Sequence, residues 1–372
     1  MRESLDGAAP RTAPAWTRRR DVTQTPHPRH GSAATVTAGG RRTPWGHVEA
    51  RRPRGGDTRG VKTLATLRLP GPAWEELREV QVIEGPWPDA LGAGRPGVEA
   101  LVVANEVVDD GVLDRLPDLR LVANYGVGYD RVDAAACAAR GVAVTNTPGV
   151  LDAATADLAF GLILAARRRI VEGDRLVRSG GWNAAWSAGP FLGREVTGAT
   201  LGIVGLGRIG AAVARRAEAF EMRVLHHRRT PGDPADGYRE LDELLRESDV
   251  VTLHVPLTAE TEGLLSRERL ALLRDGATLV NTARGAIVDE EALVDELASG
   301  RISAGLDVFV HEPRVPERLL DLPNVVLTPH IGSATVETRA AMTRVVVDNL
   351  LAAERGEPLV TPVTESERAE RR

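Results

Sequence analysis

Three short segments of the sequence carry side chains that could bind an anion and move a proton. Arg284 lies in NTARG, Glu312 in DVFVHEP and His330 in TPHIGSAT. A planar guanidinium can bind both oxygens of a carboxylate at once. An imidazole can give a proton to a developing alkoxide near neutral pH, and a nearby carboxylate favours the protonated imidazole. These residue types indicate the reduction of a small 2-oxo acid by hydride transfer.

Each of these residues follows a strand-like run, at 276–281, 302–309 and 325–330. Ligands of open α/β sheets bind at the carboxyl ends of the strands. Taken singly, the arginine could be a surface residue, the glutamate a turn residue and the histidine a satisfied core residue. Three such residues at three strand ends favour one shared catalytic site.

The segment GLGRIG lies between an apolar, β-branched run at 199–204 and a helical run. In this context Gly205 permits a tight turn, Gly207 lets a pyrophosphate approach the backbone, and Gly210 lets the helix pack closely on the strand. The helix N-terminus offers N–H groups and partial positive charge to the phosphates. The motif therefore predicts a dinucleotide site, and the alternative is a structural turn without a ligand.

The strand expected at 222–229 ends in basic residues. A site that prefers NAD has an acid about 20 positions past the glycine motif, where it binds the ribose hydroxyl. Here Arg228, Arg229 and Thr230 stand at that position. An arginine can hold the 2′-phosphate of NADP, which an aspartate would repel. The sequence therefore favours NADP as the preferred cofactor over NAD, and the alternative is a pair of solvated surface arginines.

Strand-like runs alternate with helical segments along most of the chain, which predicts an α/β fold with parallel sheets. In the first half of the chain, these runs lie at 62–67, 80–83, 99–104, 119–124 and 142–146.

We expect two Rossmann-like lobes, each with a parallel sheet, and an active site in the cleft between the two domains. Residues 61–160 and 334–362 are assigned to a discontinuous substrate-binding domain, and residues 161–333 to an NAD(P)-binding Rossmann domain. A helix at about 152–168 crosses into the second lobe, and a helix at 336–356 returns to the first. Two such crossings make a natural hinge.

The two ends of the chain differ in composition from its body. Residues 1–60 hold twelve arginines and five acids and have almost no aliphatic periodicity, so we expect a disordered basic extension. A nucleic-acid-binding arm is an alternative that the absence of any aromatic pattern disfavours, so we expect no nucleic acid partner. Residues 363–372 form a short polar tail.

The rest of the composition restricts where and how the protein works. Cys137 is the one cysteine in 372 residues, so no disulfide framework is possible, which fits the cytoplasm. No apolar run approaches the ~20 residues that span a bilayer, so we expect no membrane partner. No His, Cys, Asp or Glu residues occur at a recognised metal-binding spacing, so we expect no metal.

From about residue 62 to residue 362 the chain resembles the D-isomer-specific 2-hydroxyacid dehydrogenase family, and in particular its glyoxylate and hydroxypyruvate reductases. The segments that carry the resemblance are TNTPGVLDAATADLAFGLILAARRR, GLGRIG, LHVPLTAET, NTARGAIVDE, GLDVFVHEP and TPHIGSAT. The resemblance implies an NAD(P) cofactor and the roles given above for Arg284, Glu312 and His330.

The resemblance also implies further site residues. The backbone amides of Val127 and Gly128 would bind the substrate carboxylate, and Asp307 would contact the nicotinamide carboxamide. The pair at 282–283 would line the nicotinamide side and the pair at 255–256 the adenosine side. The other cofactor-binding residues that the resemblance implies, these pairs included, are Thr155, Arg208, Ile209, Val255, Pro256, Thr261, Thr282, Ala283, His330 and Gly332.

Several functions stay open. The favoured one is an NADPH-preferring reductase of glyoxylate, hydroxypyruvate or a similar 2-oxo acid. The alternatives are a phosphoglycerate-type, bulkier 2-oxo-acid or phosphite dehydrogenase, or a dinucleotide-sensing scaffold like the C-terminal-binding corepressors. Loops at 104–106 and 124–129 are expected to select the substrate. In the family the long helix after the crossing and the segment beyond it, here residues 175–186, form a two-fold interface. The run at 158–177 has apolar residues on more than one face, which predicts a homodimer.

Overall fold

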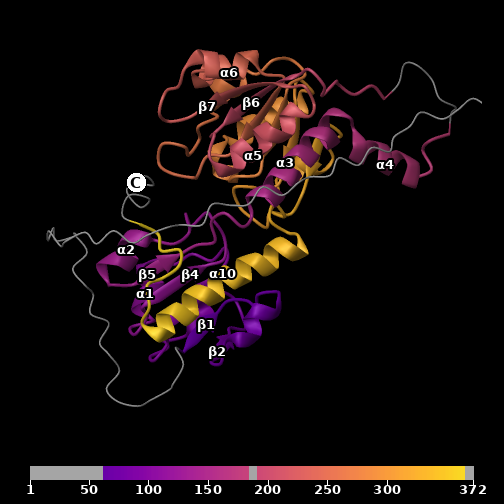
Figure 1. Ribbon diagram of the computed structural model, residues 1–372. Coiled ribbons are helices and arrows are strands. Elements are labelled where there is room, and N and C mark those ends of the chain that lie inside the picture. Colours follow the sequence, from indigo (N-terminus) through magenta and orange to yellow (C-terminus); the bar gives the residue numbers. More distant parts are fainter. Residues whose placement is uncertain (1–61, 184–190, 365–372) are drawn as a thin grey trace, which may run out of the picture. The chain divides into compact units, whose positions relative to one another are not determined.

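The computed structural model describes residues 62–183 and 191–364, which fold into two parallel sheets with helices on both faces of each (Figure 1). The predicted disorder of residues 1–60 and most of the predicted polar tail lie outside the described residues.

The first sheet has the strand order β2-β1-β3-β4-β5, and all its strands are parallel. Its strands are β1 (Thr63–Ala65), β2 (Val80–Val82), β3 (Ala100–Val103), β4 (Leu121–Asn124) and β5 (Ala143–Thr145). The central strands are buried along their whole length, because helices cover both faces of a parallel sheet.

Among the described residues, five helices pack around this sheet. They are η1 (Pro72–Glu76), η2 (Asp89–Leu91), α1 (Asp110–Asp114), α2 (Ala134–Ala139) and α10 (Val336–Arg355). The last of these comes from the far end of the sequence but packs on β4 and η1, with Met342, Val346 and Leu350 in the core (Figure 1). Cys137 of α2 is fully buried.

The second sheet has the strand order β11-β10-β9-β8-β6-β7 and is also parallel. Its strands are β6 (Thr200–Val204), β7 (Arg223–His227), β8 (Val250–Leu253), β9 (Thr278–Asn281), β10 (Ser303–Leu306) and β11 (Val325–Leu327). The strand order reverses between β6 and β8, which is where doubly wound sheets bind their ligands.

Helices cover both faces of the second sheet as well. They are α3 (Asp152–Arg167), α5 (Arg208–Glu218), η3 (Pro234–Asp236), α6 (Leu241–Glu247), α7 (Arg267–Leu270), η4 (Gly285–Ile287), α8 (Glu290–Ala298) and α9 (Glu317–Leu320). Helix α4 (Ile170–Arg178) packs on α3 and has no buried residue of its own. Helices α3 and α5 share one apolar cluster, and α6 and α8 share another on the opposite face.

The observed elements match the predicted order and are slightly shorter. The predicted strands lose residues at their ends, because those residues enter the loops. The helix predicted at 152–168 is α3, and Arg169 in the left-handed region (φ 53°) separates it from α4. The predicted domain boundary between residues 160 and 161 falls inside α3, and the division into domains stays a prediction. Within the described residues, no helix combines the length and apolar character needed to cross a bilayer.

Candidate active site

The three residues predicted to do the chemistry follow three neighbouring strands of the second sheet. Arg284 lies just beyond β9, Glu312 beyond β10 and His330 beyond β11. Nδ1 of His330 lies 2.8 Å from Oε2 of Glu312. Oε1 of the same carboxylate accepts a hydrogen bond from the backbone N–H of Phe309 at 3.1 Å, which fixes its orientation. The imidazole is thereby held through one nitrogen, and Nε2 remains for a substrate.

Charge also links the three side chains. Burial alone would raise the pKa of Glu312, but its hydrogen bond to His330 and the positive charges of His330 and Arg284 hold that pKa below its ordinary value. Glu312 is therefore ionised over the range in which enzymes usually work. Its side chain is 15% exposed, whereas that of His330 is 39% exposed, so the imidazole is the more accessible member of the pair.

Arg284 has its guanidinium committed on two sides. Nε lies 3.0 and 3.1 Å from the two carboxylate oxygens of Asp130, and Nη1 donates to the carbonyl of Ala283 at 2.7 Å. Nη2 lies over Gly128, so close that a Cβ on that glycine would be 2.0 Å from it. Asp130 is not among the predicted site residues, and the only sequence signal for it is its place as an acid two residues past Gly128 in the segment YGVGYD.

The turn after β4 carries the backbone amides predicted to bind a carboxylate. Side-chain amides hold its carbonyls: Nδ2 of Asn124 donates to Gly126 and Gly128, and Nδ2 of Asn146 donates to Val127, each at 3.0 Å. Among the described residues, no group accepts a hydrogen bond from the N–H of Val127 or Gly128. These two amides and Nη2 of Arg284 are therefore donors in one small region that have no acceptor within residues 62–183 and 191–364.

Asp307, predicted to contact the nicotinamide, organises the loop that carries His330. Its Oδ1 accepts from Thr328 at 2.6 Å and from the N–H of Ile331 at 2.8 Å. Its Oδ2 accepts from the N–H of Gly332 at 2.8 Å. Burial raises the pKa of this carboxyl although the three hydrogen bonds oppose the shift. Both oxygens thus hold the loop in place, and a nicotinamide contact would have to share one of them.

The glycine turn has the geometry that a dinucleotide needs. Gly205 has a φ of 100°, and a Cβ there would lie 2.7 Å from the backbone of His254 in the loop after β8. A Cβ on Gly210 would lie 2.2 Å from the carbonyl of Gly205. Apart from its chain neighbours, no described residue lies within 4 Å of the Cβ position of Gly207. No side chain caps the N-terminus of α5, so its first N–H groups are left for an anion.

The other predicted cofactor residues surround the same edge of the sheet. Oγ1 of Thr282 is buried and has no partner among the described residues. Thr155, near the start of α3, lies beside Gly332. In the loop after β8, Oγ1 of Thr261 donates to the carbonyl of Pro256 at 2.6 Å. The remaining predicted positions are Arg208 and Ile209, which open α5, Val255, which follows β8, and Ala283, beside Arg284.

The two arginines after β7 face different neighbours. Arg228, Arg229 and Thr230 are all exposed. Nη2 of Arg228 lies near Gly232, where a Cβ would be 3.0 Å away. The charge of Arg229 acts on Glu260 in the loop after β8 and helps to lower the pKa of that carboxyl, behind hydrogen bonds from Thr258 and from the backbone of Glu260 itself. In the described part of the chain, no carboxylate forms an ion pair with Arg228.

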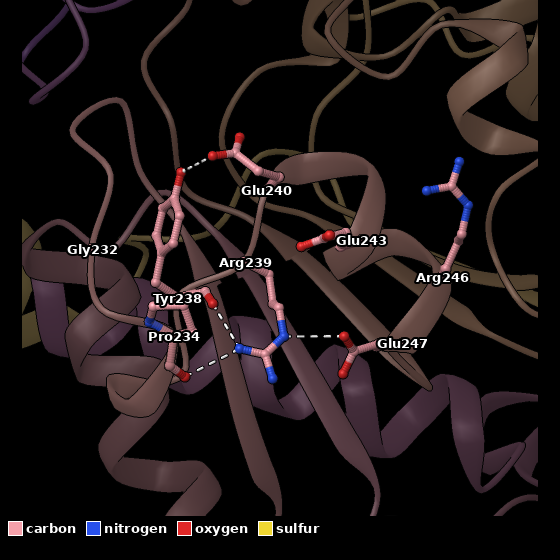
Figure 2. Close-up of a pocket in the computed structure, with 8 residues that line it drawn as sticks. All are labelled: Gly232, Pro234, Tyr238, Arg239, Glu240, Glu243, Arg246 and Glu247. Carbon is pink, nitrogen blue, oxygen red and sulfur yellow. Dashed lines mark hydrogen bonds and ion pairs between the residues drawn. The ribbon is translucent and has the colours of Figure 1, made fainter.

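A hollow of about 520 Å³ lies between residues 232–240 and helix α6 (Figure 2). Its polar groups bind one another: Nε of Arg239 lies 3.0 Å from Glu247, and the hydroxyl of Tyr238 donates to Glu240 at 2.8 Å (Figure 2). No predicted site residue lines it, and Arg239 and Tyr238 are paired with acidic residues of its own lining, so we do not assign it a ligand. Within the described residues, no cluster of three or more His, Cys, Asp or Glu could hold a metal ion.

The chain is similar in sequence and in fold to known proteins. A family model described as "D-isomer specific 2-hydroxyacid dehydrogenase, NAD binding domain" matches residues 160–332. The chain is 50% identical over 294 residues to a glyoxylate reductase from Pyrococcus furiosus, covering 76% of this chain and 86% of that one.

Two solved structures are also similar. A protein from Thermus thermophilus is 49% identical, with a TM-score of 0.76, over 81% of this chain and 99% of that one. An NADPH-dependent glyoxylate/hydroxypyruvate reductase from Sinorhizobium meliloti, in complex with NADP and malonate, is 38% identical, with a TM-score of 0.72. That match covers 83% of this chain and 98% of the other.

Proposed function

Because the chain belongs to the D-isomer-specific 2-hydroxyacid dehydrogenase family and is an NAD(P)-dependent oxidoreductase, we propose that it reduces glyoxylate, hydroxypyruvate or a similar small 2-oxo acid, with NADPH as the preferred cofactor. The observation that carries the proposal is the hydrogen bond of 2.8 Å between His330 and Glu312, with Arg284 close enough for its charge to act on that glutamate. The relatives named glyoxylate reductase support the substrate class.

Each residue has a distinct task in the proposed reaction. The amides of Val127 and Gly128 and the guanidinium of Arg284 bind the carboxylate of the substrate and orient its carbonyl. His330 donates a proton from Nε2 to the carbonyl oxygen as negative charge develops there, and Glu312 stabilises the protonated imidazole. A bound nicotinamide supplies the hydride. We propose that this site lies in a cleft between the substrate-binding domain and the NAD(P)-binding domain that were predicted from the sequence.

The proposed cofactor-binding site is supported by residues whose geometry and charge suit the parts of a dinucleotide. The open space at Gly207 and the uncapped N-terminus of α5 suit a pyrophosphate. The buried, unpartnered hydroxyl of Thr282 suits a polar group at the nicotinamide end. Arg228 lacks a carboxylate partner among the described residues, so it is available to a 2′-phosphate. This last point is the structural support for NADP over NAD.

A panel of 2-oxo acids assayed with NADPH and with NADH in parallel tests the proposal. We expect the highest kcat/KM for glyoxylate or hydroxypyruvate with NADPH. Phosphohydroxypyruvate, branched 2-oxo acids, and phosphite in the oxidising direction belong in the same panel, because each corresponds to an alternative member of the family. A preference for one of these would replace the substrate assignment. If the protein turned over none of these substrates, the proposed reductase function would be wrong.

We further propose that the protein is a cytoplasmic homodimer. A single cysteine fits a reducing compartment. Large apolar side chains are exposed on and near α4, including Ile170, Val177, Trp182 and Leu192, which are 54%, 57%, 65% and 70% exposed. An exposed apolar group of this size is typical of a protein interface. Part of the segment 175–186 that the sequence analysis assigned to this interface lies outside the described residues.

A further inference from the structure

We propose that Asp130 is a positioning residue that holds Arg284 in the orientation needed to bind the carboxylate of a 2-oxo acid. The inference rests on the proposed function, because it assigns Asp130 a task in that same site. Asp130 lies in the turn after β4, and Arg284 lies in the loop after β9, which is 154 residues further along the chain. No motif in the sequence assigns it this role.

The contact between the two side chains is specific and partly buried. Nε of Arg284 lies 3.0 Å from Oδ1 and 3.1 Å from Oδ2 of Asp130, so one N–H is shared between both carboxylate oxygens. The Asp130 side chain is 11% exposed and the Arg284 side chain 27% exposed. Such a charge-assisted contact, shielded from water, restrains the long arginine side chain more than an exposed ion pair does.

The remaining nitrogens of the guanidinium explain what this restraint achieves. Nη1 donates to the carbonyl of Ala283 at 2.7 Å. With Nε and Nη1 committed, the planar group is fixed and Nη2 lies over Gly128. Nη2 is thereby aimed at the region in which the amides of Val127 and Gly128 have no acceptor among the described residues. One turn therefore supplies both the amides and the carboxylate that places the arginine beside them.

Electrostatics argue against a purely incidental carboxylate at this position. An acid beside an anion site repels a substrate carboxylate, and the repulsion is stronger where water is excluded. Asp130 offsets this cost only if its pairing with Arg284 improves the binding of the substrate by more than the repulsion weakens it. Orientation of the guanidinium is the benefit that the observed geometry offers.

The test is a comparison of Asp130→Asn, which keeps the shape of the side chain, with the wild-type enzyme. We expect the KM for the best 2-oxo acid to rise about ten- to hundred-fold, the range for losing a charge-assisted contact to a binding group. The KM for NADPH should change less than about two-fold, because the proposed cofactor-binding site is formed by other residues. Asp133→Asn is the matched control: Asp133 caps α2 through the N–H groups of Ala135 and Ala136, so this variant can lower stability but should keep both KM values.

A double-mutant cycle separates positioning from a general structural role. If Asp130 acts through Arg284, Asp130→Asn should have no further effect on substrate KM in an Arg284→Ala background. Full additivity of the two changes, or an unchanged 2-oxo-acid KM in Asp130→Asn, would overturn the proposal. Asp130→Glu keeps the charge but moves it by one methylene, and it should also raise KM with little change in melting temperature. Asp130→Glu replaces Asp130→Asn as the test variant if Asp130→Asn does not fold.

Binding of oxamate, an unreactive analogue of a 2-oxo acid, gives a readout that needs no turnover. Calorimetry on the protein with NADPH should show oxamate binding weakened about ten-fold or more by Asp130→Asn and unchanged by Asp133→Asn. Equal oxamate affinity in wild type and Asp130→Asn would contradict the role of Asp130. A wild-type protein that binds oxamate but reduces no 2-oxo acid would instead contradict the proposed function.

Discussion

Nδ1 of His330 and Oε2 of Glu312 lie 2.8 Å apart, although the two residues follow different strands of the second sheet. The backbone N–H of Phe309 holds the other carboxylate oxygen, and the carbonyl of Asp307 accepts from the backbone N–H of His330. Hydrogen bonds to the backbone of the loop after β10 therefore hold both members of the pair. In such an arrangement the imidazole can take up and release a proton without moving, which is what a general acid requires.

Replacement of His330 by alanine tests this role directly. Loss of a general acid lowers turnover by about 10²–10⁴-fold, and we expect a fall of that size for His330→Ala in the reduction of the best 2-oxo acid. Steady-state kinetics give the turnover, and quenching of protein fluorescence gives the affinity for NADPH, which should stay near that of wild type. Turnover close to wild type would show that another group donates the proton.

Glu312→Gln should change how stability depends on pH. The pKa of Glu312 in the fold is below its ordinary value of 4.5, because its pairing with His330 outweighs burial. A depressed carboxyl pKa means that the carboxylate stabilises the fold above about pH 4.5 and loses this effect as pH falls through the lower folded value. The melting temperature of Glu312→Gln should therefore be lower than that of wild type at pH 7, and the gap should narrow below pH 4.5. A constant gap across this range would contradict the assignment.

The parts of the fold that sequence reasoning predicted are those that depend on local pattern. Buried β-branched runs mark the strands, so the ends of β9, β10 and β11 and the residues that follow them could be placed in advance. The turn at Gly205 was also predictable, because a strand before it and a helix after it restrict the backbone. These features depend on neighbours in the chain, and the structure contains them nearly where they were expected.

The features that could not be predicted depend on contacts between distant segments. The partner of Arg284, Asp130, stands 154 residues earlier, and no spacing rule connects the two. The three hydrogen bonds that the carboxylate of Asp307 accepts were also unforeseen, because they depend on how the loop after β11 folds back. Likewise the sequence placed Arg228 and Arg229 together, whereas the structure gives them different neighbours.

Gly128→Ala should impair substrate binding without unfolding the protein. The added Cβ would lie 2.0 Å from Nη2 and 2.8 Å from Cζ of Arg284, which is the flexible end of that side chain, so the guanidinium must move away. We expect the KM for the 2-oxo acid to rise about ten-fold or more, as for loss of a charge-assisted hydrogen bond. Gly161→Ala is the control, because it adds the same methyl group in α3 where, apart from the backbone of the helix itself, no described residue lies within 4 Å. Equal substrate KM in both variants would mean that Gly128 does not face the arginine.

The proposed homodimer can be tested at one apolar position of α4. Val177 is 57% exposed, and we expect Val177→Asp to convert a dimer into a monomer by burying a charge in the interface. Val360→Asp is a matched control, because Val360 is 58% exposed and lies outside α4. Size-exclusion chromatography with light scattering at micromolar concentration measures the mass. A monomeric wild type, or two variants that both stay dimeric, would rule out an interface through α4.

Cofactor choice should depend on Arg228. A 2′-phosphate carries up to two negative charges near neutral pH, and Arg228 is exposed after β7 without a carboxylate partner in the described residues. Charge-assisted hydrogen bonds contribute about 1.5–3 kcal/mol each, so one or two correspond to a preference of about ten- to several-hundred-fold for NADPH.

Arg228→Asp should reverse or abolish that preference in kcat/KM, because an aspartate repels the phosphate and accepts a hydrogen bond from the free ribose hydroxyl. Arg229→Asp is the informative companion variant, since the charge of Arg229 acts on Glu260 in the loop after β8. A smaller effect at 229 than at 228 would assign the phosphate mainly to Arg228. The ranking of 2-oxo acids should stay the same in both variants, because the substrate binds at the nicotinamide end of the cofactor. If kcat/KM of the wild-type enzyme with NADH equals or exceeds that with NADPH, neither arginine selects for the 2′-phosphate.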